Sequence, residues 1–219
     1  MMSGLRTYWK NDQVTNEETA RILELAGQAF GVDGDFVEMG CYRGDTSLLL
    51  AEVLRDSNVG AVEKSVGNLG KSGGKEVEKG SSGGMGKRLW IYDSFEGLPE
   101  KNSMDESVLG VDFKSGELAV TKREVKERFL RAGLPVPVIK KAWFSDLSGS
   151  DLPERIAFAF LDGDFYESIQ DSLKLVTPKM SKNGVVVVHD YTNPALPGVR
   201  KAVNEWGQAK NDYFYVVLL

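Results

Sequence analysis

Acidic side chains and a histidine follow apolar segments at five places along the chain. These places hold Glu38 with Gly40 and Gly44, Asp93, residues 143–146, Asp162 with Asp164, and His189 with Asp190. In an open sheet of parallel strands, ligands bind beyond the carboxyl ends of the strands, so residues at these ends face one crevice. Gathered carboxylates suit metal ions and other cations. The sequence therefore predicts one acidic site built from several strand ends.

The glycine-bearing turn lies between a predicted strand and a predicted helix. Gly40 and Gly44 would let the backbone approach a ligand closely, and the helix that follows offers N–H donors to a carboxylate or phosphate. The dinucleotide fingerprint has three glycines, whereas this turn has two. Glu38 would repel a pyrophosphate but accept hydrogen bonds from an ammonium group. S-adenosylmethionine suits such a crevice, with Asp93 placed to accept from its ribose hydroxyls. A tight structural turn beside a helix-capping aspartate fits these residues equally well.

Three passages resemble the most distinctive motifs of the macrocin O-methyltransferase family. They are VEMGCYRGDTS at 37–47, YDSFEGLP at 92–99 and DGDFYES at 162–168, and Trp143-Phe144 and residues 197–203 resemble two further motifs. The matches follow the family order from about residue 36 to 206. The resemblance implies a class I methyltransferase fold, S-adenosylmethionine as donor, and Mg²⁺-assisted methylation of a hydroxyl, often on a sugar of a secondary metabolite.

The same resemblance implies which residues bind the donor. The turn from Glu38 to Thr46 would hold the methionine part, Asp93 with Ser94 the ribose, and residues 143–146 would lie beside the adenine. The cofactor-binding residues implied in this way are Glu38, Gly40, Tyr42, Gly44, Thr46, Asp93, Ser94, Trp143 and Asp146.

The later strand ends are the place for catalysis. A divalent cation would lower the pKa of a hydroxyl and orient it, and Asp162 and Asp190 offer the oxygen ligands that Mg²⁺ prefers. The family usually has two aspartates where this chain has His189-Asp190. His189 is either a ligand that favours Mn²⁺, Fe²⁺ or Zn²⁺, a general base in a site without metal, or a buried histidine hydrogen-bonded at a strand end.

We take three residues as both candidate catalytic residues and candidate metal ligands: Asp162, His189 and Asp190. Asp164 is a further candidate: it could orient the acceptor or act as a base, and it could equally cap the helix that follows it.

The elements that must position these residues alternate between strand and helix. Strands are predicted at 35–39, 88–92, 136–139, 156–161, 185–188 and 213–219, and helices at 15–30, 47–55, 121–130, 166–176 and 199–206. Two of the strands are apolar without alternation, as expected where a parallel sheet is covered on both faces. The pattern predicts an α/β fold with a doubly wound, mostly parallel sheet, Rossmann-like as in class I methyltransferases.

The length of 219 residues, 42% of them hydrophobic, predicts a single methyltransferase domain over 1–219. Residues 58–87 hold nine of the 24 glycines among Ser and Lys, which predicts a flexible insertion, either a plain solvated loop or a lid. Class I methyltransferases usually finish with an antiparallel strand pair. The chain stops after what reads as the first of the two, so it is either truncated or completed by a partner chain in a homo-oligomer.

Composition excludes several classes of function. The net charge of −5 and the lack of a Lys/Arg block argue against nucleic acid binding. An apolar run long enough for a signal peptide or a membrane span is missing, and Cys41 alone cannot form an intramolecular disulfide. We expect a cytoplasmic enzyme with a small-molecule hydroxyl acceptor. The alternatives are a nicotinamide-dependent oxidoreductase and a methyltransferase-like binding protein without catalysis.

Overall fold

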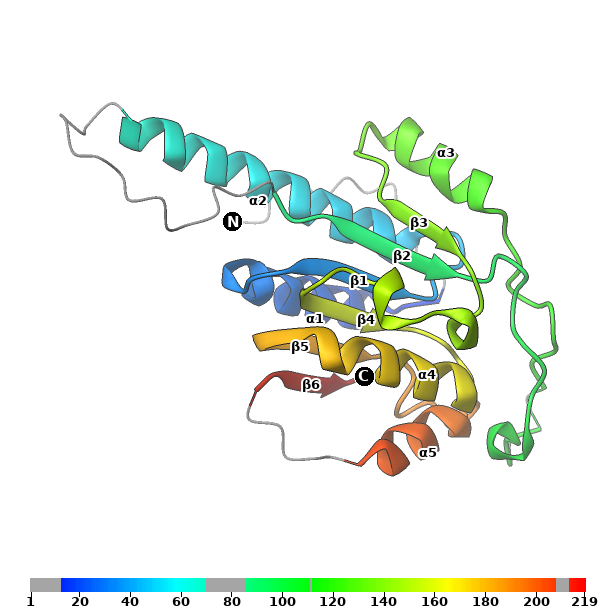
Figure 1. Cartoon of the computed structure of the whole chain (residues 1–219). Coiled ribbons are helices and arrows are strands. Elements are labelled where there is room, and N and C mark those ends of the chain that lie inside the picture. The colour runs from blue at the N-terminus through cyan, green and yellow to red at the C-terminus, as the bar shows by residue number, and fades with distance from the viewer. Residues whose placement is uncertain (1–12, 70–85, 111, 208–212) are drawn as a thin grey trace.

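The centre of the molecule is a six-stranded sheet in which every pair of neighbouring strands is parallel (Figure 1). The computed structural model describes residues 13–69, 86–110, 112–207 and 213–219. The strand order is β3-β2-β1-β4-β5-β6. The strands are β1 (Asp35–Met39), β2 (Leu89–Asp93), β3 (Val138–Lys141), β4 (Ile156–Leu161), β5 (Met180–Val188) and β6 (Tyr215–Leu218). The order reverses between β1 and β4, so the predicted doubly wound sheet is confirmed.

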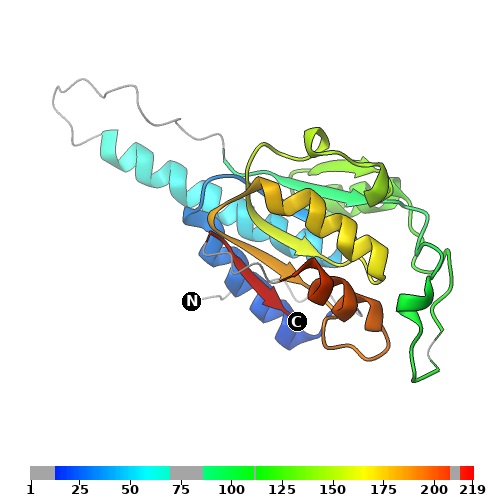
Figure 2. The same ribbon diagram turned by 60° about the horizontal axis from the view of Figure 1, so that its bottom comes forward.

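Helices cover both faces of this sheet (Figures 1 and 2). One face packs against α1 (Asn16–Gln28), α2 (Asp45–Leu69) and α3 (Lys122–Ala132), and the other against α4 (Tyr166–Val176) and α5 (Pro197–Trp206). Thr121 and Glu124 form a capping box at the start of α3, and Thr15 and Glu18 form another at α1. Among the described residues, the structure holds no helix with the length and apolarity that crossing a membrane requires.

The core consists of two apolar clusters, one on each face of the sheet. Successive residues of a strand point to opposite faces, so Phe36 packs with the helices of one face and Val37 with those of the other. Every residue of β4 is buried, as expected for a central strand of a parallel sheet. The two layers hold the strands in register and bring their carboxyl ends to one edge.

Helix α2 is longer than the sequence predicts. The prediction ended this helix near Arg55 and began a flexible insertion at residue 58, but the helix continues to Leu69. Its extension contains only two glycines, whereas the other glycines of the predicted insertion follow it, and Ala61, Glu63 and Lys64 within the extension favour a helix. The part of the prediction that covers 70–85 lies outside the described residues.

Candidate active site

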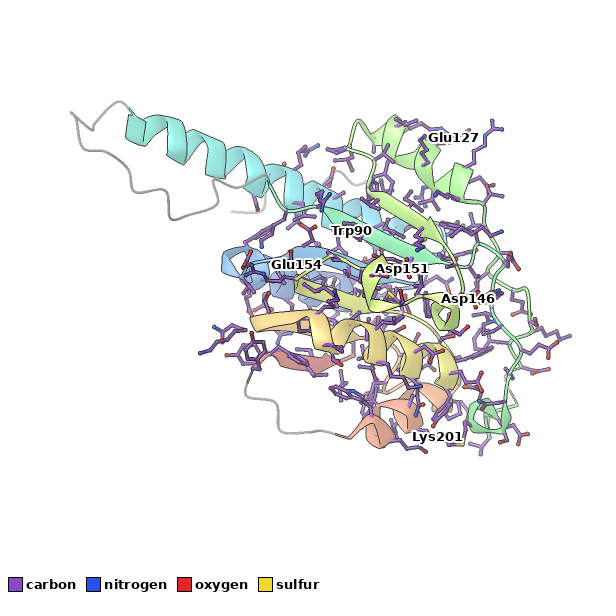
Figure 3. The ribbon with its side chains drawn as sticks, in the orientation of Figure 1. Trp90, Glu127, Asp146, Asp151, Glu154 and Lys201 are labelled. Carbon is purple, nitrogen blue, oxygen red and sulfur yellow. The ribbon has the colours of Figure 1, made fainter. Side chains whose placement is uncertain are left out.

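A cavity opens at the carboxyl ends of β1, β2, β4 and β5, with about 910 Å³ of space between atoms, part of it open solvent. It brings together most of the residues that the sequence predicts: Glu38, Gly40, Tyr42, Thr46, Asp93, Ser94, Trp143, Asp162, His189 and Asp190. Gly44 and Asp146 do not line it. Asp146 is exposed in the short 3₁₀ helix η3 (Phe144–Asp146), near the carboxyl edge of the sheet (Figure 3).

Asp93 ties the end of β2 to the turn that follows β1. Its Oδ2 accepts from the backbone N–H of Cys41 at 2.8 Å and of Tyr42 at 3.3 Å, and its Oδ1 accepts from the N–H of Phe95 at 2.7 Å. Tyr42 and Phe95 have φ values of 45° and 54°, a left-handed conformation that is costly without such support. Asp93 therefore shapes the glycine turn in addition to lining the cavity.

The two glycines of the turn serve the approach of protein segments to each other. At Gly40, φ is +90° and an added Cβ would lie 2.0 Å from the carbonyl oxygen of Asp162, so only glycine lets β1 end against β4. At Gly44, φ is +78° and a Cβ would lie 3.2 Å from Val125 of α3. The sequence interpretation assigned these glycines to the approach of a ligand, and the structure supplies a second, purely internal reason.

The carboxyl group of Glu38 lies buried beneath the glycine turn. Its side chain is fully buried, its Oε2 accepts a short hydrogen bond from the Ser47 hydroxyl, and its Oε1 has no hydrogen-bond partner. Burial raises the pKa of Glu38 from 4.5 to about 8; the Ser47 bond opposes this, and the charges of Asp162, Asp93 and Asp45 add to it. An unpartnered carboxyl oxygen at the cavity suits a ligand that brings N–H donors.

His189 lies between two carboxylates at the end of β5. Its Nδ1 is 2.9 Å from Asp162 Oδ1 and 3.0 Å from Asp190 Oδ2, and its side chain is only 4% exposed. Burial alone would lower the pKa of His189, but the two carboxylates outweigh it and raise the pKa to about 11. The ligand atoms of these three residues all lie within 4.8 Å of one another. The cluster therefore favours a positive charge at its centre.

Asp164 adds a further carboxyl to the same side of the cavity. Burial, together with the charges of Asp162 and Asp190, raises its pKa well above the usual range. Asp164 and Asp190 both have φ of +60°, and the Asn193 amide donates to Asp190 at 2.8 Å. Strained backbone and crowded carboxyls at one place are typical of functional sites.

The sequence interpretation missed part of the cavity wall. Leu98 and Leu118 line it from the long segment between β2 and α3, and Gln13 and Val14 line it from just before α1. Leu98 lies within the family motif at 92–99, which could have indicated it, whereas the residue types of Leu118, Gln13 and Val14 do not distinguish them from ordinary core or loop residues. Asp45, at the start of α2, also lines the cavity, while its carboxylate pairs with Arg128 of α3.

A doubly wound sheet with a glycine turn after its first strand and an acidic cavity at its switch point belongs to the Rossmann-like class to which methyltransferases also belong. A sequence profile described as Macrocin-O-methyltransferase (TylF) matches residues 79–212, which is more than half of the chain. The chain therefore belongs to the macrocin O-methyltransferase family, as its motifs predict.

Curated relatives of the chain carry related names. It is 32% identical over 183 residues to the 8-demethyl-8-(2,3-dimethoxy-alpha-L-rhamnosyl)-tetracenomycin-C 4'-O-methyltransferase of Streptomyces olivaceus, covering 81% of this chain and 59% of that one. It is 28% identical to the demethyldecarbamoylnovobiocin O-methyltransferase of Streptomyces niveus, covering 83% and 60%. The chain thus spans less than two thirds of the length of these relatives.

Solved structures of similar fold are O-methyltransferases as well. The O-methyltransferase NovP aligns with a TM-score of 0.66 and 27% identity, covering 89% of this chain and 72% of that one. The calicheamicin methyltransferase CalS11 aligns with a TM-score of 0.59 and 18% identity, covering 88% and 72%, and this likeness concerns the fold alone.

Proposed function

We propose that this protein transfers a methyl group from S-adenosylmethionine to a hydroxyl of a small molecule, such as a sugar of a secondary metabolite. The observation that carries the proposal is the meeting of two features in one cavity: the glycine turn above Glu38, and the cluster of Asp162, His189 and Asp190. The family supports it, because relatives named for tetracenomycin and novobiocin derivatives are O-methyltransferases.

The turn side of the cavity suits the donor. Glu38 offers an unpartnered, buried carboxyl oxygen to the α-ammonium group, and Asp93 lies where ribose hydroxyls would donate. Trp143, with Phe144 beside it, would cover the adenine, whereas Asp146 lies outside the cavity lining. S-adenosylmethionine, when bound, supplies a methyl group activated by its sulfonium charge. The residues of the turn orient that group and exclude water from it.

The opposite side of the cavity suits a divalent cation and the acceptor. Asp162, His189 and Asp190 fit such an ion, because two carboxylates and one imidazole nitrogen already surround a point that favours positive charge. A cation held there lowers the pKa of a nearby hydroxyl. Asp164 lines the same space and is a further candidate to orient the acceptor or to act as a base.

Binding and turnover test this function separately. Calorimetric titration with S-adenosylmethionine, S-adenosylhomocysteine and NADH should show binding of the first two only, since the turn lacks the third glycine of the dinucleotide fingerprint. Binding of NADH alone would instead favour the oxidoreductase alternative.

Asp190→Ala should abolish methyl transfer to a library of hydroxylated acceptors, while donor affinity stays within a few fold. Asp33→Ala is the matched control, because Asp33 lies near the opposite end of β1 and its side chain is 70% exposed. This variant should keep both methyl transfer and donor affinity. Joint loss of donor binding and turnover in Asp190→Ala would count against the assigned roles. Donor binding without product, whatever divalent ion is added, would favour a binding protein.

A further inference from the structure

We propose that the cluster of Asp162, His189 and Asp190 binds a transition-metal ion of the Zn²⁺ and Fe²⁺ class in preference to Mg²⁺, with His189 Nδ1 as a ligand and Glu18 as the residue that orients the ring. The inference rests on the metal site of the proposed function. It adds the class of ion, the ligating nitrogen and a positioning residue from a distant element, α1.

The chemical types of the three ligand atoms indicate which class of metal ion the cluster prefers. Mg²⁺ favours a shell of oxygen atoms and keeps several waters, whereas an imidazole nitrogen suits Zn²⁺ and Fe²⁺. Nδ1 of His189 lies about equally far from the carboxylates of Asp162 and Asp190, at 2.9 Å and 3.0 Å. The nitrogen therefore belongs to the same set of ligand atoms as the two oxygens.

The orientation of the ring is fixed by packing. His189 is 4% exposed, and its ring packs at a centroid distance of 5.8 Å against the ring of Phe160 in the neighbouring strand β4. Because the ring is enclosed, turning Nδ1 away from the carboxylates would require repacking of the core. The geometry thus commits Nδ1, rather than Nε2, to the cluster.

The surroundings of the other ring nitrogen, Nε2, identify Glu18 as the residue that orients the ring. Nε2 is buried without a hydrogen-bond partner, and Glu18 Oε1 lies 3.8 Å from it. A histidine that binds a metal through one nitrogen usually donates its other N–H to a carboxylate or carbonyl, which fixes the tautomer and the ring orientation. Glu18 is held for this role by its second oxygen, which accepts from the backbone N–H and hydroxyl of Thr15 at 2.9 Å and 2.7 Å.

Nuclear magnetic resonance can determine which ring nitrogen binds the metal, because His189 is the only histidine of the sequence. The full chain, labelled with ¹⁵N-histidine and free of a histidine tag, is titrated with Zn²⁺ and separately with Mg²⁺. Zn²⁺ should move the Nδ1 signal to a metal-bound position while Nε2 keeps its proton, and Mg²⁺ should leave Nδ1 unligated. Ligation through Nε2, or no response to Zn²⁺, would overturn the inference.

Selectivity is tested with His189→Asp, which converts the donor set to oxygen only. Most protein sites bind Zn²⁺ more tightly than Mg²⁺, so the decisive quantity is the change in the ratio of the two affinities between wild type and variant, measured by competition with a fluorescent chelator. We expect the preference for Zn²⁺ to fall by about tenfold or more. An unchanged ratio would contradict the role of the imidazole.

Glu18→Gln isolates the positioning residue. Glutamine at this position still serves the capping box with Thr15, so α1 keeps its start. Zn²⁺ affinity should fall by about tenfold, whereas Glu17→Gln, an exposed neighbour in the same turn, should leave it unchanged. Equal affinities in both variants would remove Glu18 from the proposal. Titration of each variant with S-adenosylhomocysteine separates the two proposals: retained donor binding with failed metal selectivity refutes this inference alone.

Discussion

The two sides of the cavity neutralise their carboxylates in different ways. At the ends of β1 and β2, Asp93 is surrounded by three backbone N–H groups. At the ends of β4 and β5, Asp162 and Asp190 face each other across a single imidazole, that of His189, with Asp164 close by. On the first side, Asp93 is satisfied by backbone groups and shapes the turn, whereas Glu38 keeps one carboxyl oxygen without a hydrogen-bond partner. On the second side, two carboxylates share the one imidazole between them, and we propose that this side receives a cation.

Backbone strain does not distinguish the two sides. Left-handed residues occur on both, with Tyr42 and Phe95 at the first and Asp164 and Asp190 at the second. What differs is the contact made at these residues. On the first side the N–H groups of Tyr42 and Phe95 donate to Asp93, whereas on the second side the Asp190 carboxylate contacts His189 and accepts from the Asn193 amide. Substitutions should therefore affect stability most on the first side and ion binding most on the second.

Gly40→Ala should produce the largest effect. The new Cβ would lie 2.0 Å from the Asp162 carbonyl oxygen at a φ of +90°, so steric overlap and backbone strain add to a loss of about 3 kcal/mol or more in unfolding free energy. Urea unfolding monitored by circular dichroism measures this loss of unfolding free energy. The matched control is Gly27→Ala on α1, where nothing lies within 4 Å of the added Cβ and helix propensity predicts a small gain. Equal midpoints for Gly40→Ala and wild type would refute this explanation of the turn.

A pair of isosteric variants compares the sides directly. Asp93→Asn weakens charged hydrogen bonds to three N–H groups, which should cost about 2 kcal/mol of stability and reduce the affinity for S-adenosylhomocysteine. Asp162→Asn also removes a carboxylate that crowds Glu38 and Asp164, so it should cost less. Chemical denaturation of both variants measures their stability, and calorimetric titration measures their affinity for S-adenosylhomocysteine. A greater loss of stability in Asp162→Asn would show that the contrast between shape and charge is mistaken.

The sequence predicts which residues of the site lie at the strand ends, because the ends of buried strands are easy to recognise. The unbroken apolar run at 156–161 and the valines at 185–188 are typical of buried parallel strands, and the residues that follow such strands meet at one edge. The helix predicted at 121–130 is confirmed as well, because the capping-box spacing of Thr121 and Glu124 that begins it is local in the sequence.

The parts that were not predicted depend on contacts between distant segments. The leucines of the wall reach the cavity because the segment between β2 and α3 is anchored, in part by Asp105, which accepts from the N–H of Tyr166. The contact of Glu18 with His189 joins α1 to β5, and periodicity only showed that α1 has a buried face. The extension of α2 to Leu69 was missed because glycine content was averaged over a window that includes a helical part.

The pH dependence of stability should report the buried acid on the first side. The unfolded chain loses the Glu38 proton near 4.5, and the folded chain keeps it until about pH 8. The folded state thus binds the extra proton in this window, so the contribution of Glu38 is full below about pH 4.5 and is lost as the pH rises towards 8. Glu38→Gln cannot ionise, and its stability relative to wild type should rise across the window by at least about 1.4 kcal/mol, the equivalent of one pKa unit.

Urea unfolding at a series of pH values measures this difference. Glu17→Gln, which removes an exposed carboxylate, should give a difference that stays flat with pH. A flat curve for Glu38→Gln as well would mean that Glu38 ionises in the folded protein as it does in water.

Arg128→Ala should give the smallest effect and tests whether the two sides are independent. Arg128 donates from α3 to the Arg43 carbonyl at 2.6 Å and pairs with Asp45, so it supports the turn from outside the cavity. Its loss should cost about 1 kcal/mol and weaken donor binding a few fold, whereas Arg123→Ala on the same helix, 85% exposed, should cost less than about 0.5 kcal/mol. Zn²⁺ affinity measured on the same samples decides the comparison. If it is unchanged, the turn and the ion cluster are separate units that share a cavity; if it falls together with donor affinity, the cavity responds as a whole and the division into shape and charge fails.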